Sequence, residues 1–257
     1  MRPGQSLTVL FSAFAWVWMC VVFMLCFFAS FSVWLVTAPF DRGRYWAGFA
    51  GRKAGSLASL VNPLWTFSWA GPAPKDPRKP YVVVTNHESS ADPFLLARLP
   101  FEMKYLSKKS LFKIPFFGWA MYFAGDIPVD RGDKSDRGAA LARCAVVLRR
   151  KVSILIFPEG TRSRTAELLP FRHGPFRLAI ECGVDVLPLG ISGTRGVIPK
   201  GTWLLSPSRA CVMIGEPVST AGLTPDDAPA LAERVFVIVS RLRAEAAAKV
   251  ALDAASA

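Results

Sequence analysis

The chain has 257 residues, of which 52% are hydrophobic, and it carries a formal net charge of +12. This length accommodates one sizeable catalytic domain plus an appendage, and the hydrophobic fraction is high for a soluble protein. The five cysteines are odd in number and show no CxxC spacing. This pattern indicates unpaired thiols in a reducing compartment and argues against a disulfide framework or a metal site.

The excess hydrophobicity lies at the N-terminus, where no charged residue occurs between Pro3 and Phe40. As a helix, residues 7–36 would be roughly 45 Å long, against a hydrocarbon core of roughly 30 Å. We expect residues 1–40 to form a membrane-embedded helix, tilted or protruding and ended by Pro39. Whether it crosses the bilayer or lies in one leaflet stays open. A cleaved signal peptide is the alternative, but the apolar run is too long and lacks a convincing cleavage site.

Basic residues are more numerous after this segment than before it. Only Arg2 precedes it, and the basic residues that follow are Arg42, Arg44, Arg52 and Lys53. The positive-inside rule therefore places the rest of the chain on the cytoplasmic side of the inner membrane. Because no basic stripe or nucleic-acid motif is present, anionic lipid headgroups and phosphate substrates explain the net charge better than nucleic acid does.

Residues 41–79 comprise a segment, 42–70, in which basic residues alternate with aromatic and aliphatic ones, and then a linker rich in proline. This pattern predicts an amphipathic helix at the membrane interface, with Trp65 and Trp69 just beyond it. An ordinary amphipathic helix that covers the domain core is the alternative. The linker, residues 71–80, is identified by its Gly and Pro content.

Residues 80–257 show the pattern of an α/β domain. Apolar runs predict strands at residues 81–85, 103–107, 127–129, 152–157, 184–191 and 210–214. Helices are expected from residue 92 and over 111–124, 136–150, 175–181 and 224–250. Strands that alternate with helices predict a largely parallel sheet flanked by helices.

Polar clusters follow two of these strands, where ligands bind in such sheets. His87, one of only two histidines, follows the first strand, and Asp92 comes five residues later. A histidine held by a carboxylate is a minimal general base for a hydroxyl. The spacing alone is equally compatible with a buried loop histidine beside a helix-capping aspartate. The second cluster, residues 157–162, supplies a cation for an anionic substrate.

Four segments resemble, in order, the motifs of the glycerolipid acyltransferases, the family of 1-acylglycerol-3-phosphate acyltransferases. The resemblance extends over roughly residues 80–215. The four segments are Asn86-His87-x-Ser89-x-x-Asp92, the run from Gly125 to Arg131, the run from Phe157 to Ser163, and Val186-Leu187-Pro188-Leu189. Four motifs in order are far more specific than any one alone.

The resemblance implies that His87 is the general base and that Asp92 orients it, without a covalent acyl-enzyme. It also implies a phosphate-acceptor site, because guanidinium groups match phosphate oxygens and glycine lets backbone amides approach. The residues of this site are Arg131, Glu159, Gly160, Thr161 and Arg162. We expect Glu159 to hold an arginine or a glycerol hydroxyl, since an ionised carboxylate does not bind phosphate.

The reaction implied is transfer of a fatty acyl group to the 2-hydroxyl of 1-acylglycerol-3-phosphate (lysophosphatidic acid), forming phosphatidic acid. The donor would be acyl-CoA or acyl carrier protein, no cofactor would be bound, and membrane lipids would be partners; the oligomeric state stays open. Alternatives are another acceptor, such as glycerol-3-phosphate, another lysophospholipid or a lyso-aminolipid, and a non-catalytic lipid-binding protein. An esterase would need a GxSxG elbow, which the sequence lacks.

One segment departs from the family pattern. Lysine is usual in the family where this chain has Arg172-His173. Arg172 keeps a cation there, and His173 is more typical of an ordinary loop residue than of a second base. The departure puts the preferred acceptor headgroup in doubt.

Overall fold

A seven-stranded, largely parallel sheet organises the computed structural model, which describes residues 3–62, 64–163, 167–198 and 203–255, with only the backbone given for 3–8. The strand order is β1-β7-β6-β2-β5-β3-β4, and every neighbouring pair is parallel except β6 and β7. The strands are β1 (Trp65–Ala70), β2 (Val82–Thr85), β3 (Met103–Lys108), β4 (Ile127–Val129), β5 (Ser153–Ile156), β6 (Val186–Ser192) and β7 (Ser208–Ile214). The predicted α/β class is confirmed.

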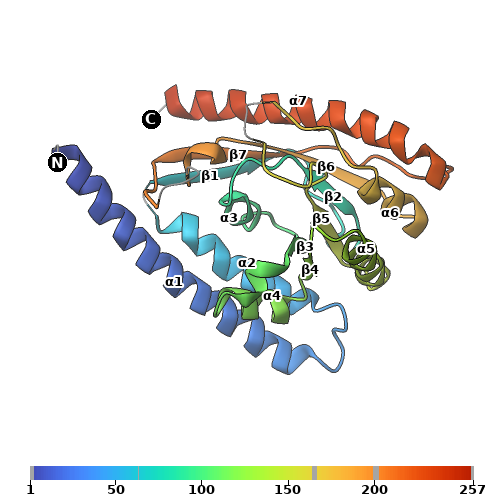
Figure 1. Cartoon of the computed structure of the whole chain (residues 1–257), viewed down its shortest axis with the longest axis horizontal. Coiled ribbons are helices and arrows are strands. Elements are labelled where there is room, and N and C mark those ends of the chain that lie inside the picture. The colour runs from blue at the N-terminus through green and yellow to red at the C-terminus, as the bar shows by residue number, and fades with distance from the viewer. Residues whose placement is uncertain (1–2, 63, 164–166, 199–202, 256–257) are drawn as a thin grey trace.

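Helices cover both faces of the sheet (Figure 1). They are α1 (Pro3–Thr37), α2 (Tyr45–Leu60), α3 (Asp92–Leu96), α4 (Phe117–Ala124), α5 (Lys134–Arg149), α6 (Gly174–Cys182) and α7 (Ala228–Ala255). Short 3-10 turns occur at η1 (Lys109–Lys113), η2 (Thr194–Gly196) and η3 (Pro225–Asp227). The long helix α7 lies along β6 and β7, whereas α1, α2 and α4 form a separate layer on the opposite side (Figure 1).

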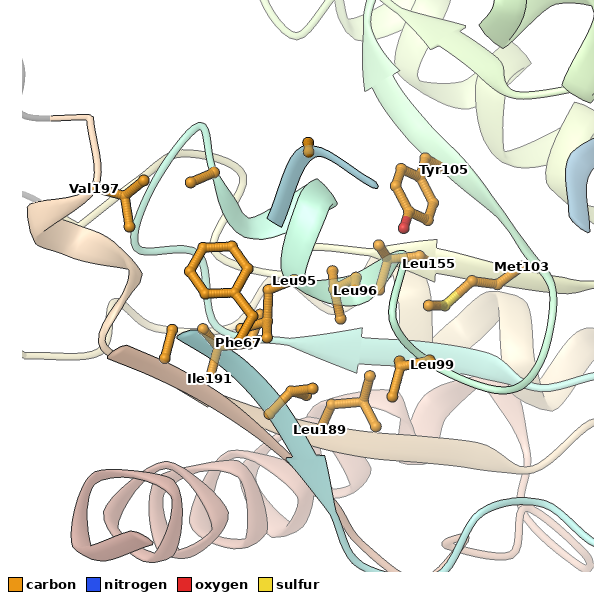
Figure 2. Close-up of a cluster of buried hydrophobic side chains, with 14 of the residues drawn as sticks. Phe67, Leu95, Leu96, Leu99, Met103, Tyr105, Leu155, Leu189, Ile191 and Val197 are labelled. Carbon is orange, nitrogen blue, oxygen red and sulfur yellow. The ribbon is translucent and has the colours of Figure 1, made fainter. Parts of the chain in front are cut away.

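The alternation of side chains along each strand divides the core into two apolar clusters. Val83 and Leu155 point into the cluster shared with α1 and α3, whereas their neighbours Val82 and Ile154 point into the one shared with α5, α6 and α7. Figure 2 shows the first cluster, in which Leu95 of α3 lies among side chains of several strands. The central strands β2, β5 and β6 are buried almost throughout because both faces of the sheet are covered there.

Strand β1 was not predicted from the sequence. Its residues alternate between buried and exposed, with Trp65 and Phe67 inside, and it pairs in parallel with β7. The tryptophans had indicated a membrane interface, but here the period-2 alternation reflects a strand at the edge of the sheet. The sheet therefore begins at Trp65, and the predicted domain boundary at residue 80 leaves out one of its strands.

The predicted helix over residues 111–124 is divided in two. The turn η1 ends at Lys113, and α4 begins only at Phe117. Pro115 lies between them and cannot donate a helical hydrogen bond. The N-terminal helix, in contrast, ends at Thr37, close to the predicted stop at Pro39.

Basic side chains in and beside α2 point into the protein. The guanidinium of Arg52 forms an ion pair with Asp126 and lies 4.0 Å from the Tyr105 ring centroid. Lys53 Nζ donates to the Leu99 carbonyl at 2.9 Å. These cations were expected to mark the cytoplasmic membrane surface, but both side chains instead fasten α2 to the α/β domain.

A second buried ion pair lies beside the first. Lys104 and Glu102 of the β3 region are fully buried, and Lys104 Nζ is 2.8 Å from Glu102 Oε1. Burial lowers the pKa of Lys104 and raises that of Glu102. Lys104 also donates to the Arg44 carbonyl at 2.7 Å, which joins the start of α2 to β3.

Replacing Lys104 by Met should strongly destabilise the fold, because it leaves the buried Glu102 carboxylate without its closest cation. A loss of about 3–5 kcal/mol is expected for breaking such a pair. Thermal unfolding of the detergent-purified protein measures the effect, with Lys108→Met at an exposed position as control. The double variant Glu102→Leu/Lys104→Met should recover stability, and an unchanged melting temperature in Lys104→Met would contradict the argument.

Candidate active site

The pair of His87 and Asp92 lies at the carboxyl end of β2. His87 Nδ1 is 2.6 Å from Asp92 Oδ2, and the same oxygen accepts the backbone amides of Glu88 at 2.9 Å and Ser89 at 3.1 Å. The other carboxylate oxygen accepts the Thr194 hydroxyl at 2.5 Å. Asp92 is fully buried, and donors to an ionised carboxylate stabilise the charge. With Nδ1–H directed at Asp92, the Nε2 atom of His87 is left to accept a proton.

The loop that carries His87 is fixed to the sheet on either side. The Asn86 side chain donates to the Ile191 carbonyl at 2.9 Å and accepts the Ile191 amide at 2.8 Å, which ties the loop to β6. The carbonyl of His87 accepts the Ser163 amide at 3.3 Å. His87 therefore has little freedom to leave its place beside Asp92.

Glu159 contacts the backbone of this loop. Its Oε1 accepts the His87 amide at 2.8 Å, and its Oε2 accepts the Leu169 amide at 2.9 Å. Burial raises the pKa of Glu159. Of the two expected partners, an arginine is not found, because both oxygens accept backbone N–H groups and no described arginine forms an ion pair with Glu159. The contact with a glycerol hydroxyl stays a prediction. The contact of Glu159 with His87 makes it a support for the histidine.

Phe157 joins the histidine to a cavity. Its ring stacks on the His87 imidazole, with centroids 4.0 Å apart and planes 21° from parallel. Phe157 also lines a cavity of about 240 Å³ whose wall contains Arg131, Arg137 and Arg172. Apolar side chains from β3, β4 and α5 complete the wall. The general-base candidate and the cationic cavity thus share one aromatic side chain.

Arginines surround Gly160 at the edge of this cavity. Arg131 Nη1 donates to the Gly160 carbonyl at 3.1 Å. Gly160 has φ of +72°, and a Cβ at this position would lie only 2.6 Å from Arg172 Nε. Only glycine combines this backbone conformation with such close approach of the guanidinium.

The arginines near Gly160, namely Arg131, Arg162 and Arg172, are poorly neutralised by the protein. Within the described part of the chain, no carboxylate forms an ion pair with Arg131, Arg162 or Arg172. Burial lowers the pKa of Arg131, and the nearby cations Arg172 and Arg162 lower it further. An anion in the cavity would relieve this repulsion, and guanidinium groups bind phosphate oxygens in pairs.

The predicted residues are thus partly brought together. His87 and Asp92 are bonded, Arg131 contacts Gly160, and Glu159 supports His87. Arg162 donates to the Ser90 hydroxyl of the His87 loop at 2.9 Å, and Thr161 is exposed.

The sequence reading assigned no role to Phe157, Arg137, Thr194 or Arg243. The sequence could have indicated Thr194 as a site residue, since Gly193-Thr194-Arg195 is a polar cluster that directly follows the apolar run of β6. Arg243 of α7 donates from Nε to Glu88 Oε1 at 3.1 Å. No sequence pattern could have indicated this contact, because the two residues are far apart in the chain.

Residues 70–192 match the family described as Acyltransferase. A chloroplastic 1-acyl-sn-glycerol-3-phosphate acyltransferase, BAT2 of Brassica napus, is 38% identical over 152 residues, which are 58% of this chain and 44% of that protein. The alpha form of the same enzyme from Mus musculus is 38% identical over 162 residues, 62% of this chain and 57% of that protein. The chain thus spans about half the length of the curated relatives it matches.

A solved structure is similar over almost the full chain. The 1-acyl-sn-glycerophosphate (LPA) acyltransferase PlsC from Thermotoga maritima aligns with a TM-score of 0.75 and 27% identity, covering 95% of this chain and 97% of that one. The resemblance to the glycerolipid acyltransferases, read from four motifs, is confirmed. Residues 70–192 thus match the Acyltransferase family, and 95% of the chain aligns with the fold of PlsC.

Proposed function

We propose that this protein is a 1-acylglycerol-3-phosphate acyltransferase, which acylates the 2-hydroxyl of lysophosphatidic acid to give phosphatidic acid. The observation that carries the proposal is the junction at Phe157, where a carboxylate-held histidine adjoins a cavity lined by unneutralised arginines. A base beside a phosphate-binding cavity suits an acceptor that contains both a hydroxyl and a phosphate. The similar proteins from Brassica napus and Thermotoga maritima are acyltransferases that act on such an acceptor.

His87 carries the chemical step in this proposal. Its Nε2 removes the proton of the acceptor hydroxyl as the oxygen attacks the thioester carbonyl. The C–O ester bond forms and the C–S bond breaks. The departing thiolate receives the proton from the imidazolium. Asp92 holds the Nδ1–H and stabilises the imidazolium, and general-base catalysis of this type contributes roughly 10²–10⁴ in rate. An acyl-CoA and an acyl carrier protein offer the same thioester, so both are candidate donors.

The arginine cavity would hold the acceptor phosphate. Arg131 and Arg172 both lie close to Gly160, and their guanidinium groups would bind the phosphate oxygens in a bidentate manner. Gly160 and Arg162 complete the cationic side of the site, and Glu159 acts through the His87 backbone. A neutral acceptor would leave the arginines without a counter-charge, so the cavity favours phosphorylated ones.

We further propose that the protein acts at the cytoplasmic face of the inner membrane, with α1 in the bilayer. Among the described residues, Val9–Thr37 is the one helix long and apolar enough to cross a membrane. Large apolar side chains along it are exposed, including Phe14, Phe28 and Val36. Its Phe27 packs against Trp119 of α4, whose ring is also exposed. A lysophospholipid resides in the bilayer, which requires the site to open at the interface.

The first test replaces the base and its partner. His87→Ala and Asp92→Asn should each lower kcat by at least about 10²-fold, since proton removal is lost or the imidazole is no longer held. The measurement is thiol release from acyl-CoA, and in parallel from acyl carrier protein, with lysophosphatidic acid as acceptor. His173→Ala, which alters the other, exposed histidine, is the matched control. A folded His87→Ala variant with normal turnover would contradict the mechanism.

The second test addresses the phosphate site. Arg131→Met and Arg172→Met should raise the KM for lysophosphatidic acid about tenfold or more, because each removes a charge-assisted contact. Turnover of an uncharged monoacylglycerol, however slow, should not respond. Arg177→Met, at an exposed position of α6 where the arginine pairs with Glu181, is the control. Equal effects on charged and uncharged acceptors would show that the arginines do not bind the phosphate.

The third test separates two roles of Glu159. In Glu159→Gln the amide can accept only one of the two backbone N–H groups, so the support of His87 is weakened. We expect kcat to fall about tenfold while the KM for lysophosphatidic acid changes little, since a misplaced base affects the chemical step. A rise in KM with unchanged kcat would instead place Glu159 in direct contact with the acceptor.

A further inference from the structure

Helix α7 lies outside residues 70–192 yet contacts the loop that carries the histidine. We propose that Arg243 of α7 is a positioning residue for the catalytic loop, residues 86–92, and acts on it through Glu88. The other supports of this loop come from β6, from η2 and from the segment that follows β5.

The contact is made between largely buried groups. Arg243 Nε donates to Glu88 Oε1 at 3.1 Å, and the two side chains are 24% and 5% exposed. Glu88 lies directly between His87 and Ser89, and its own backbone amide donates to Asp92 Oδ2. Glu88 is therefore held by Asp92 through its backbone and by α7 through its side chain. A shift of Glu88 would move the hydrogen bonds that fix the catalytic pair.

The packing of α7 determines where Arg243 lies. A Cβ at Gly190 of β6 would come within 2.4 Å of the Arg243 amide nitrogen, so the helix passes directly over a glycine. Val239 and Leu242 are buried beside it and anchor the helix on the sheet. Arg243 thus reaches Glu88 from a backbone that is itself fixed.

The charges around Glu88 explain why an arginine is needed. Burial raises the pKa of Glu88, and Asp92 acts in the same direction, whereas Arg243 and Arg195 oppose them. Arg243 also favours the ionised form of Glu159, which supports the His87 amide. Without Arg243, two buried carboxylates beside the histidine lose a counter-charge. An unpaired buried carboxylate either binds a proton or moves toward water, and both disturb the loop.

The kinetic test rests on the proposed function and uses the full chain in detergent. Arg243→Met should lower kcat for lysophosphatidic acid by about 10²-fold, because a small misplacement of the base has this effect, while KM stays within about twofold. Arg243→Lys should restore part of the rate. Arg241→Met is the matched control, since Arg241 lies on the same helix and forms an exposed pair with Glu245. It should behave as wild type.

Two further variants separate positioning from loss of stability. Leu231→Ala weakens the packing of α7 far along the helix from Arg243 and does not touch Glu88, so its melting temperature should fall while kcat is retained. Glu88→Gln/Arg243→Met removes the carboxylate together with its cation, and its kcat should equal that of Glu88→Gln alone. Equal loss of kcat in Leu231→Ala and Arg243→Met, or additive losses in the double variant, would overturn the proposal.

Hydrogen exchange tests the same inference without catalysis. The amides of His87, Glu88 and Ser89 are bonded to Glu159 or Asp92 and should exchange faster in Arg243→Met than in Arg241→Met or Leu231→Ala. If the wild type releases no thiol, the proposed function fails and the exchange result still decides the role of Arg243. Unchanged exchange in Arg243→Met would refute that role.

Discussion

The buried carboxylate of Asp92 is the constraint on which the active-site region depends. A charge in this position is stable only when surrounding donors replace water, and the protein supplies an imidazole, two backbone amides and the Thr194 hydroxyl. These donors come from the loop after β2 and from η2 after β6. The two strands are neighbours in the sheet, so their carboxyl ends meet around one anion. The same arrangement that satisfies Asp92 also fixes the orientation of His87.

The cavity lined by arginines differs from the surroundings of Asp92, because its charges lack partners within the protein. Around Asp92 a buried negative charge is stabilised by hydrogen-bond donors, whereas Arg131 and Arg172 lie near one another without a carboxylate partner in the described residues. Structural ion pairs elsewhere, such as Arg52 with Asp126, are neutralised internally. The difference separates charges that stabilise the fold from charges that, in the proposed function, bind a ligand. A phosphate would complete the second set in the way that Thr194 and the loop amides complete the first.

Much of this architecture can be predicted from the sequence because it depends on local patterns. Buried strands appear as apolar runs, and polar motifs directly after them lie at the carboxyl edge of a parallel sheet. Strand β1 was missed because alternating tryptophans are also typical of a membrane interface, and only the pairing with β7 distinguishes the two. The backbone amides that donate to Glu159 were not predicted, because every residue except proline has such an amide and the sequence does not indicate which one is used. Contacts such as Arg243 with Glu88 depend on how α7 packs, which no local pattern encodes.

The segment that matches the family is therefore smaller than the unit that supports the chemistry. Residues 70–192 include β2 to β6 and both catalytic candidates, but β6 would be left as an edge strand without its antiparallel partner β7. The pairing of β6 with β7 also positions Ser192 and the turn that carries Thr194. The face of β6 beneath α7 would be exposed, although Leu242 and Val239 cover it in the whole chain. The hydrogen bond from Thr194 to Asp92 and the ion pair between Arg243 and Glu88 thus both depend on elements beyond or at the end of the matched segment. The loop therefore requires the complete sheet to hold His87 in place.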